Sequence, residues 1–275
     1  MLFCQISDLH IKAARKLAYG VVDTAGMFAA CVAAVLRLSP APDAVLITGD
    51  LVDIGSDAEY QLLAQLIAPL EATGGLPVYL IPGNHDERDA LRRNFPRHTY
   101  LRQWQPFAQY VIDDFPLRIV ALDTVIPGKG GGLLCSERLD WIDRALGAAP
   151  SKPTVILMHH PPFVTGIGHM DRVGLQGADA LEAIVARHPQ VERLLCGHLH
   201  RSIQARFGGT FASTCPSPAH QVALDLGTAS PDNFVMEPPG YQLHWWNGKQ
   251  LITHTAVLGD FGGPHPFRVG GKLID

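Results

Sequence analysis

Five short motifs rich in Asp, Asn and His are the part of this sequence that could bind metal ions. They are, in chain order, Asp8-Leu9-His10, Gly49-Asp50, Gly83-Asn84-His85-Asp86, His159-His160-Pro161-Pro162 and Gly197-His198-Leu199-His200. Carboxylate, amide and imidazole groups are the oxygen and nitrogen donors that proteins offer to such ions. Asp50 has two carboxylate oxygens and could bridge two ions, whereas Asn84 offers one neutral oxygen.

Two of these motifs place their donors two residues apart. On an extended backbone alternate side chains point the same way, so Asp8 and His10, or His198 and His200, could meet one ion. A single pair of this kind is more often ordinary polar surface, and a Gly-Asp turn often does no more than end a strand. Five such motifs in order, each following an apolar segment or a loop, are hard to attribute to coincidence and predict a metal centre.

Short apolar segments precede the motifs and have the character of buried strands. They are Leu2–Ile6, Ala44–Thr48, Val78–Ile81, Thr154–Met158 and Val191–Cys196, with a further strand at Arg118–Leu122. Capping residues and helical periodicity between them predict helices over Asp23–Leu38, from Ser56 to Leu70, and after Ser136. Alternating strands and helices indicate an α/β fold with sheets buried on both faces. Open sheets of this kind bind ligands beyond the carboxyl ends of their strands, where the motifs fall.

The alternation of strands and helices ends near residue 202. Four more strands are predicted, at Ile203–Phe207, Thr210–Thr214, Tyr241–Trp246 and Gln250–Val257. The last two form a hairpin around Asn247-Gly248, a strong turn signal. Residues 216–240 are rich in Pro, Asp and Ser and show no clear period. The apolar residues Phe234–Met236 and Phe261 could serve an interface or pack on their own domain.

Composition excludes several classes of protein. Hydrophobic residues make up 47% of the chain, enough for a substantial core, and the net charge is −4 without a block of Lys or Arg. Extended nucleic-acid binding usually needs a basic surface, so we expect none. No window approaches the roughly 20 apolar residues of a membrane span. Five scattered cysteines without a CxxC motif, and an N-terminus without a basic leader, predict reduced thiols and a cytoplasmic location.

The order and spelling of the motifs give the chain a family likeness. Its segments SDLH, GDLVD, GNHD, MHHPP and GHLH resemble the calcineurin-like metallophosphoesterase superfamily. Within it, the chain is similar to bacterial glycerophosphodiesterases and class III cyclic nucleotide phosphodiesterases. The resemblance implies a four-layer α/β/β/α sandwich with a small C-terminal cap. It also divides the chain into a catalytic domain over residues 1–215 and a cap and dimerisation segment over residues 216–275, which includes late strands of the sandwich.

The resemblance also implies a centre of two divalent or trivalent metal ions with a shared ligand. One ion takes Asp8, His10, Asp50 and His200, and the other takes Asp50, Asn84, His159 and His198. His160 is the alternative to His159 as a ligand. The mixed donor set accepts Fe, Mn, Zn or Co. Catalytic roles fall to Asp50 and His85, and the residues expected to contact the substrate are Asn84, His85, His160 and His220.

A centre of this kind suits the hydrolysis of a small phosphodiester. Two divalent ions, two carboxylates and a bridging hydroxide leave a net charge of about +1, which attracts an anionic diester. The hydroxide would attack phosphorus, and His85, if protonated, could stabilise or protonate the leaving group. Glycerophosphodiesters and 3′,5′-cyclic nucleotides both remain open as substrates, and we expect a homo-oligomer, dimeric or larger.

Two alternative functions remain. A phosphomonoesterase is one, but the phosphatase motif GDxVDRG reads GDLVDIG here, with Ile54 in place of the arginine that grips phosphate. A catalytically silent scaffold is the other, and it would be expected to have lost ligands. All seven of the implied metal ligands are present in this chain.

Overall fold

Two β-sheets form the centre of the protein in the computed structural model, which describes residues 1–72, 75–227, 229 and 231–274. The first sheet has the order β15-β14-β1-β2-β3. Its strands are β1 (Leu2–Ile6), β2 (Ala44–Thr48), β3 (Val78–Ile81), β14 (Gly240–Trp246) and β15 (Leu251–Val257). The second sheet has the order β10-β11-β9-β7-β5-β4. Its strands are β4 (Tyr110–Ile112), β5 (Arg118–Ala121), β7 (Thr154–Leu157), β9 (Val191–Cys196), β10 (Gln204–Phe207) and β11 (Thr210–Thr214).

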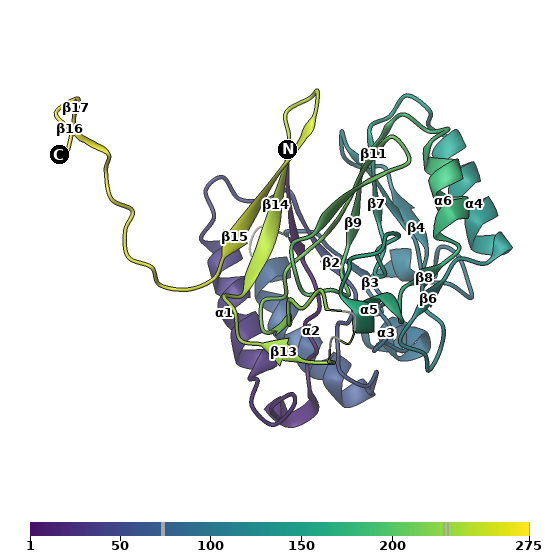
Figure 1. The fold of residues 1–275 in the computed structure, drawn as a ribbon, viewed down its shortest axis with the longest axis horizontal. Coiled ribbons are helices and arrows are strands. Elements are labelled where there is room, and N and C mark those ends of the chain that lie inside the picture. The colour runs from purple at the N-terminus through teal and green to yellow at the C-terminus, as the bar shows by residue number, and fades with distance from the viewer. Residues whose placement is uncertain (73–74, 228, 230, 275) are drawn as a thin grey trace.

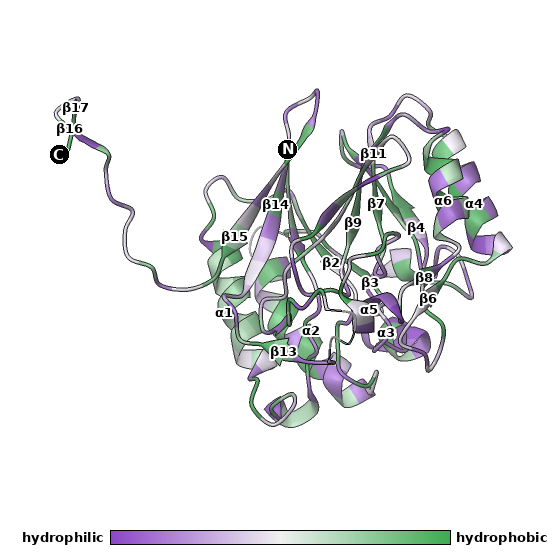
Figure 2. Cartoon of the chain, viewed as in Figure 1, coloured by the Kyte–Doolittle hydropathy of each residue, from purple (hydrophilic) through white to green (hydrophobic). Residues whose placement is uncertain are grey.

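Helices cover the outer faces of the two sheets and complete four layers (Figure 1). On the first sheet lie α1 (Thr24–Leu36) and α2 (Asp57–Ala72), and on the second lie α4 (Ser136–Gly147) and α6 (Ala178–Val185). Hydrophobic residues run along the inner strands, and polar residues gather on the outer surfaces of α4 and α6 (Figure 2). The predicted α/β/β/α sandwich is therefore confirmed. Among the described residues, no helix has the length and apolar character to cross a membrane.

Predicted and observed elements differ mainly at their ends and at short connections. Asp23 precedes α1 as its N-cap, because its side chain accepts a hydrogen bond from the Gly26 N–H at 2.9 Å. Two helices, α3 (Arg88–Asn94) and α6, were not predicted, because neither segment is long enough to show a clear period. Several short elements were not predicted either, namely β4, α5 (Gly168–Asp171), β6 (Gly132–Leu133), β8 (Leu175–Gln176), β12 (Gln221–Val222), β13 (Phe234–Val235), β16 (Arg268–Val269), β17 (Lys272–Leu273) and two short 3-10 helices.

Residues after 215 contribute to both the sandwich and its surroundings. β14 pairs antiparallel with β1, with Leu2 opposite Trp245, so the late hairpin completes the first sheet. Beyond β15 the chain extends away from the body and ends in the small hairpin of β16 and β17 (Figure 1). Residues 228, 230 and 275 of the expected C-terminal segment lie outside the described residues.

A buried polar network joins the two sheets. The Gln5 side-chain amide of β1 donates to the Thr48 hydroxyl at 2.9 Å and to the Cys196 carbonyl of the second sheet at 3.0 Å. Its carbonyl oxygen accepts from His244 Nε2 at 3.0 Å, and His244 Nδ1 lies 2.8 Å from the Thr253 hydroxyl. Both ring nitrogens of this fully buried histidine are therefore satisfied. Burial, with a smaller effect of the positive charge on Arg193, lowers the pKa of His244 to about 3.

This pKa predicts acid sensitivity. Between pH 6.5 and about 3 His244 is protonated in the unfolded chain but stays neutral in the folded protein. The free energy of unfolding therefore falls as the pH falls. We expect the free energy of unfolding to fall by about 1.4 kcal/mol per pH unit more than in His244→Gln, which can still donate to Gln5. Urea unfolding across this range measures both slopes. Parallel slopes would contradict the prediction, because the other titrating groups are common to both proteins.

Candidate metal centre

Tight turns at the strand ends aim the predicted ligands inward. Five of these residues are non-glycine residues in the left-handed region, with φ of 58° at Asp8, 46° at His10, 47° at Asp50, 71° at His198 and 51° at His200. Such backbone costs energy and persists where the surrounding structure enforces it, often at functional sites. The expectation of an extended backbone at Asp8-x-His10 and at His198-x-His200 is therefore wrong.

Glycines allow these turns to approach one another. Gly49 has a φ of 89°, and a Cβ atom there would collide with the His159 ring. At Gly83 an added Cβ would collide with the Asp50 carboxylate and its backbone nitrogen. The Gly-Asp and Gly-Asn-His-Asp motifs need these glycines because another side chain would separate the donors.

The first donor group contains Asp8, His10 and His200. His10 Nε2 lies 3.1 Å from His200 Nε2 and 3.6 Å from Asp50 Oδ2, and His200 Nε2 lies 3.7 Å from Asp8 Oδ1. The His200 Nδ1–H donates to the His220 carbonyl at 3.0 Å, which leaves Nε2 to face the group. The donors predicted for one metal ion therefore lie together.

The second donor group forms around His159. Its Nδ1–H donates to the Thr48 carbonyl at 2.9 Å, and its Nε2 lies 3.0 Å from Asn84 Oδ1 and 3.4 Å from Asp50 Oδ1. The rings of His159 and His198 are 5.1 Å apart. Asp50 thus presents one oxygen to each group, the position of the shared ligand. His198 and His200, two residues apart in sequence, belong to different groups.

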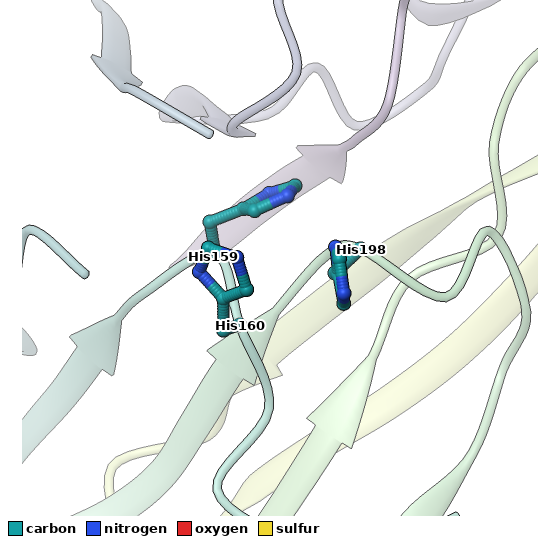
Figure 3. A group of neighbouring side chains, drawn as sticks. All are labelled: His159, His160 and His198. Carbon is teal, nitrogen blue, oxygen red and sulfur yellow. The ribbon is translucent and has the colours of Figure 1, made fainter. Parts of the chain in front are cut away.

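His160 is placed differently from its neighbour. Figure 3 shows the His159, His160 and His198 side chains converging beyond the strand ends. The two ring nitrogens of His160 are both engaged by the protein, Nδ1 at 2.8 Å from the Thr124 hydroxyl and Nε2 at 3.1 Å from the Gly130 carbonyl. Fully buried, His160 packs 4.6 Å from the His198 ring and does not line the cavity described below. Its predicted substrate contact stays a prediction.

Several buried donor atoms in the two groups lack partners. Asp8 Oδ2, His10 Nδ1 and His198 Nε2 have no hydrogen bond within the described residues. Burial lowers the pKa of His10 and of His198 well below the usual value, which keeps their lone pairs available. Burial would also lower the pKa of His159, but Asp50 and Asp8 raise it to about 9, so the second group favours positive charge. Unpaired buried polar atoms are costly, and these mixed N and O donors fit two divalent ions.

The GNHD motif contains a residue, Asp86, whose role was not predicted from the sequence. The Asp86 carboxylate accepts from the Leu51 N–H at 3.0 Å, the Gly83 N–H at 2.8 Å and the Tyr60 hydroxyl at 2.8 Å. These hydrogen bonds connect the loop that carries Asp50 with the loop that carries Asn84, and the bond from Tyr60 connects both loops with α2. The motif itself was the available signal, but the partners come from distant segments.

A cavity of about 510 Å³ opens above the two donor groups. His85 lines it with its Nδ1 2.7 Å from the Asp53 carbonyl, and its ring lies 4.6 Å from that of His10. Burial alone would lower the pKa of His85, but Asp50 and Asp53 raise it, which favours an imidazolium able to donate a proton. His220, also predicted to contact substrate, lines the cavity too. The cavity is also lined by residues that the predicted site did not include, namely Tyr19, Gly130, Met170, Val173, Val222 and residues 232–234.

The fold and this paired donor site agree with the family that sequence comparison gives. A model described as calcineurin-like phosphoesterase matches residues 1–202, and the chain belongs to this family. It is 42% identical, over the full length of both chains, to a probable glycerophosphodiester phosphodiesterase GpdQ from Arcobacter nitrofigilis. It is 32% identical to the 3′,5′-cyclic adenosine monophosphate phosphodiesterase CpdA from Pseudomonas aeruginosa, over 88% of this chain and 84% of that protein.

Solved structures support the fold. A dimetal phosphatase from Danio rerio superposes with a TM-score of 0.68 at 16% identity, covering 94% of this chain and 98% of that one. At this identity the likeness concerns the fold alone.

Proposed function

We propose that this protein hydrolyses small phosphodiesters with the help of two metal ions. The observation that carries the proposal is a pair of buried donor groups sharing Asp50 at the floor of a cavity that His85 also lines. The relatives named for glycerophosphodiester and cyclic nucleotide hydrolysis support a diester as the substrate. Both substrate classes, and Fe, Mn, Zn or Co as the metal, remain within the proposal.

The protein's own groups would act on the substrate as follows. Asp8, His10, Asp50 and His200 would hold one ion, and Asp50, Asn84, His159 and His198 the other. Bound there, the ions would supply positive charge for the phosphoryl oxygens and activate water. His85, oriented by its bond to the Asp53 carbonyl, would donate a proton to the departing alkoxide.

The test compares initial rates with bis(p-nitrophenyl) phosphate and p-nitrophenyl phosphate, after loading with Mn²⁺ and after chelation. A rate that needs metal and favours the diester supports the proposal. Preference for the monoester would instead identify a phosphomonoesterase, and no activity with any metal would identify a silent scaffold. Ile54, 74% exposed where the phosphatase motif has arginine, argues against the monoester.

We also propose that residues 216–275 act as a cap and as an oligomerisation segment. The extended end of the chain carries apolar side chains in water, with Phe267 88% exposed and Phe261 70% exposed. A second copy would cover such residues. Light scattering should give a multimer for the full chain and a smaller species after truncation at Leu258. A cytoplasmic location, inferred from five free cysteines, belongs to the same set of proposals.

A further inference from the structure

Three aromatic rings form one side of the outer cavity. The ring of Tyr19 lies 5.0 Å from that of Phe234 and 5.2 Å from that of His220, and the rings of His220 and Phe234 are 5.3 Å apart. Tyr19 is 55% exposed and has a φ of 50°, a left-handed conformation that is unfavourable for a bulky side chain. A turn that holds an aromatic residue strained and exposed at a cavity is a candidate for ligand contact.

The outer part of the cavity carries the negative charge of Asp232. Nearer the floor lie Asp50 and His85, whose surroundings favour its imidazolium form, and none of the described lining residues is Lys or Arg. Pairing of Val222 with Phe234, and a 2.9 Å hydrogen bond from the Ala223 N–H to the Asn233 carbonyl, hold this segment beside the cavity. Asp232 is 93% exposed, and its Oδ1 lies 3.7 Å from His169 Nε2.

The carboxylate of Asp232 is close enough to Tyr19 to affect the pKa of its phenol. Burial and the neighbouring carboxylates, Asp53 and Asp232 among them, raise the pKa of Tyr19 to about 12. Tyr19 therefore remains a neutral ring with an electron-rich face at physiological pH. A ring of this kind, beside another aromatic face and a carboxylate, attracts organic cations.

We infer that the outer cavity binds the positively charged nitrogen of the alcohol in a zwitterionic phosphodiester, through Asp232, Tyr19 and Phe234. The inference rests on the proposed function, because the phosphate must lie at the metal donor groups. A substrate with an anionic phosphate and a cationic head group would match this cavity, whose floor would be positive with two metal ions bound and whose rim carries the Asp232 carboxylate. A cyclic nucleotide has no such cation, and an alcohol carrying a second anionic group would be repelled.

The experiment compares glycerophosphocholine and glycerophosphoethanolamine with the uncharged-alcohol diester glycerophosphoglycerol, using the metal-loaded full chain. Asp232→Asn keeps the shape of the side chain and removes its charge. We expect it to lower kcat/KM about fivefold for the two cationic diesters, mainly through KM, with little change for glycerophosphoglycerol. Asp225→Asn makes the same charge change on an exposed residue that does not line the cavity, and should leave all three rates unchanged.

A second measurement does not depend on the natural substrate. Choline should inhibit hydrolysis of bis(p-nitrophenyl) phosphate competitively in the wild type, and about fivefold more weakly in Asp232→Asn and in Phe234→Leu. Diester hydrolysis without a charge preference, or a loss in Asp232→Asn that is equal for all diesters, would overturn the inference and leave the proposed function intact. Failure to hydrolyse any diester would overturn both.

Discussion

Replacing Asp50 with alanine should lower kcat/KM for a phosphodiester by about a thousandfold. Asp50 presents Oδ2 at 3.6 Å from His10 and Oδ1 at 3.4 Å from His159, so both donor groups lose a ligand at once. Charge stabilisation by a metal centre is worth several kcal/mol, and each 1.36 kcal/mol is a factor of ten in rate. The effect should appear in kcat as well as in KM.

Asp50→Asn is the informative companion variant, because it keeps the volume and one carbonyl oxygen but cannot bridge two groups as a carboxylate. We expect its rate to lie well below that of the wild type and its metal content to be reduced. Circular dichroism and thermal unfolding of both variants establish that the fold is retained, which is a necessary control since the Asp50 carboxylate also accepts from the His85 N–H at 2.9 Å. Near-wild-type activity in either variant would contradict the assignment of Asp50.

The adjacent histidines should respond very differently to substitution. His159→Ala should lower activity by about a thousandfold and leave about one metal ion per chain, because it removes Nε2 from the second donor group. His160→Gln should lower activity only about tenfold, the usual range for a residue that supports a ligand. The difference arises because both nitrogens of His160 bond to Thr124 and Gly130, whereas His159 uses one nitrogen for Thr48.

The two variants are compared by their metal content, measured by mass spectrometry, and by their activity with bis(p-nitrophenyl) phosphate. Thr124→Val is a matched control, because it removes one partner of His160 without touching either histidine. It should reproduce part of the His160→Gln effect and keep two ions. If His160→Gln loses an ion while His159→Ala keeps both, the ligand is His160 and the assignment must be exchanged.

The residue pattern alone was enough to predict an α/β fold and the location of the site, whereas the four layers were implied by the family resemblance. Continuous apolar strands such as Ala44–Thr48 require burial on both faces, and strands alternating with helices permit few architectures. The donors directly follow strands whose carboxyl ends meet at one edge. For this reason residue type and position in the chain predicted that Asp8, Asp50, Asn84 and His159 lie at one edge, and the family resemblance implied how they divide between two ions.

The backbone conformation of the turns, and so the direction in which their side chains point, could not be predicted in the same way. Alternation along an extended strand suggested that His198 and His200 share an ion, yet both residues have positive φ and face different groups. A left-handed turn is stabilised by its neighbours, here the bond from the His198 N–H to Asp8 Oδ1 at 2.9 Å, and these lie far away in sequence. Local periodicity contains no information about such contacts.

The sequence by itself determined which donors this protein possesses and that strand ends would bring them together, because burial patterns and residue types are local properties. Only the tertiary structure decided which of two adjacent histidines directs its Nε2 toward Asn84 and Asp50, and which residues wall the cavity. Tyr19, His220 and Asp232 meet there from segments about 200 residues apart. Their juxtaposition depends on the pairing of β14 with β1 in the first sheet and on the pairing of β12 with β13, neither of which has a local signal.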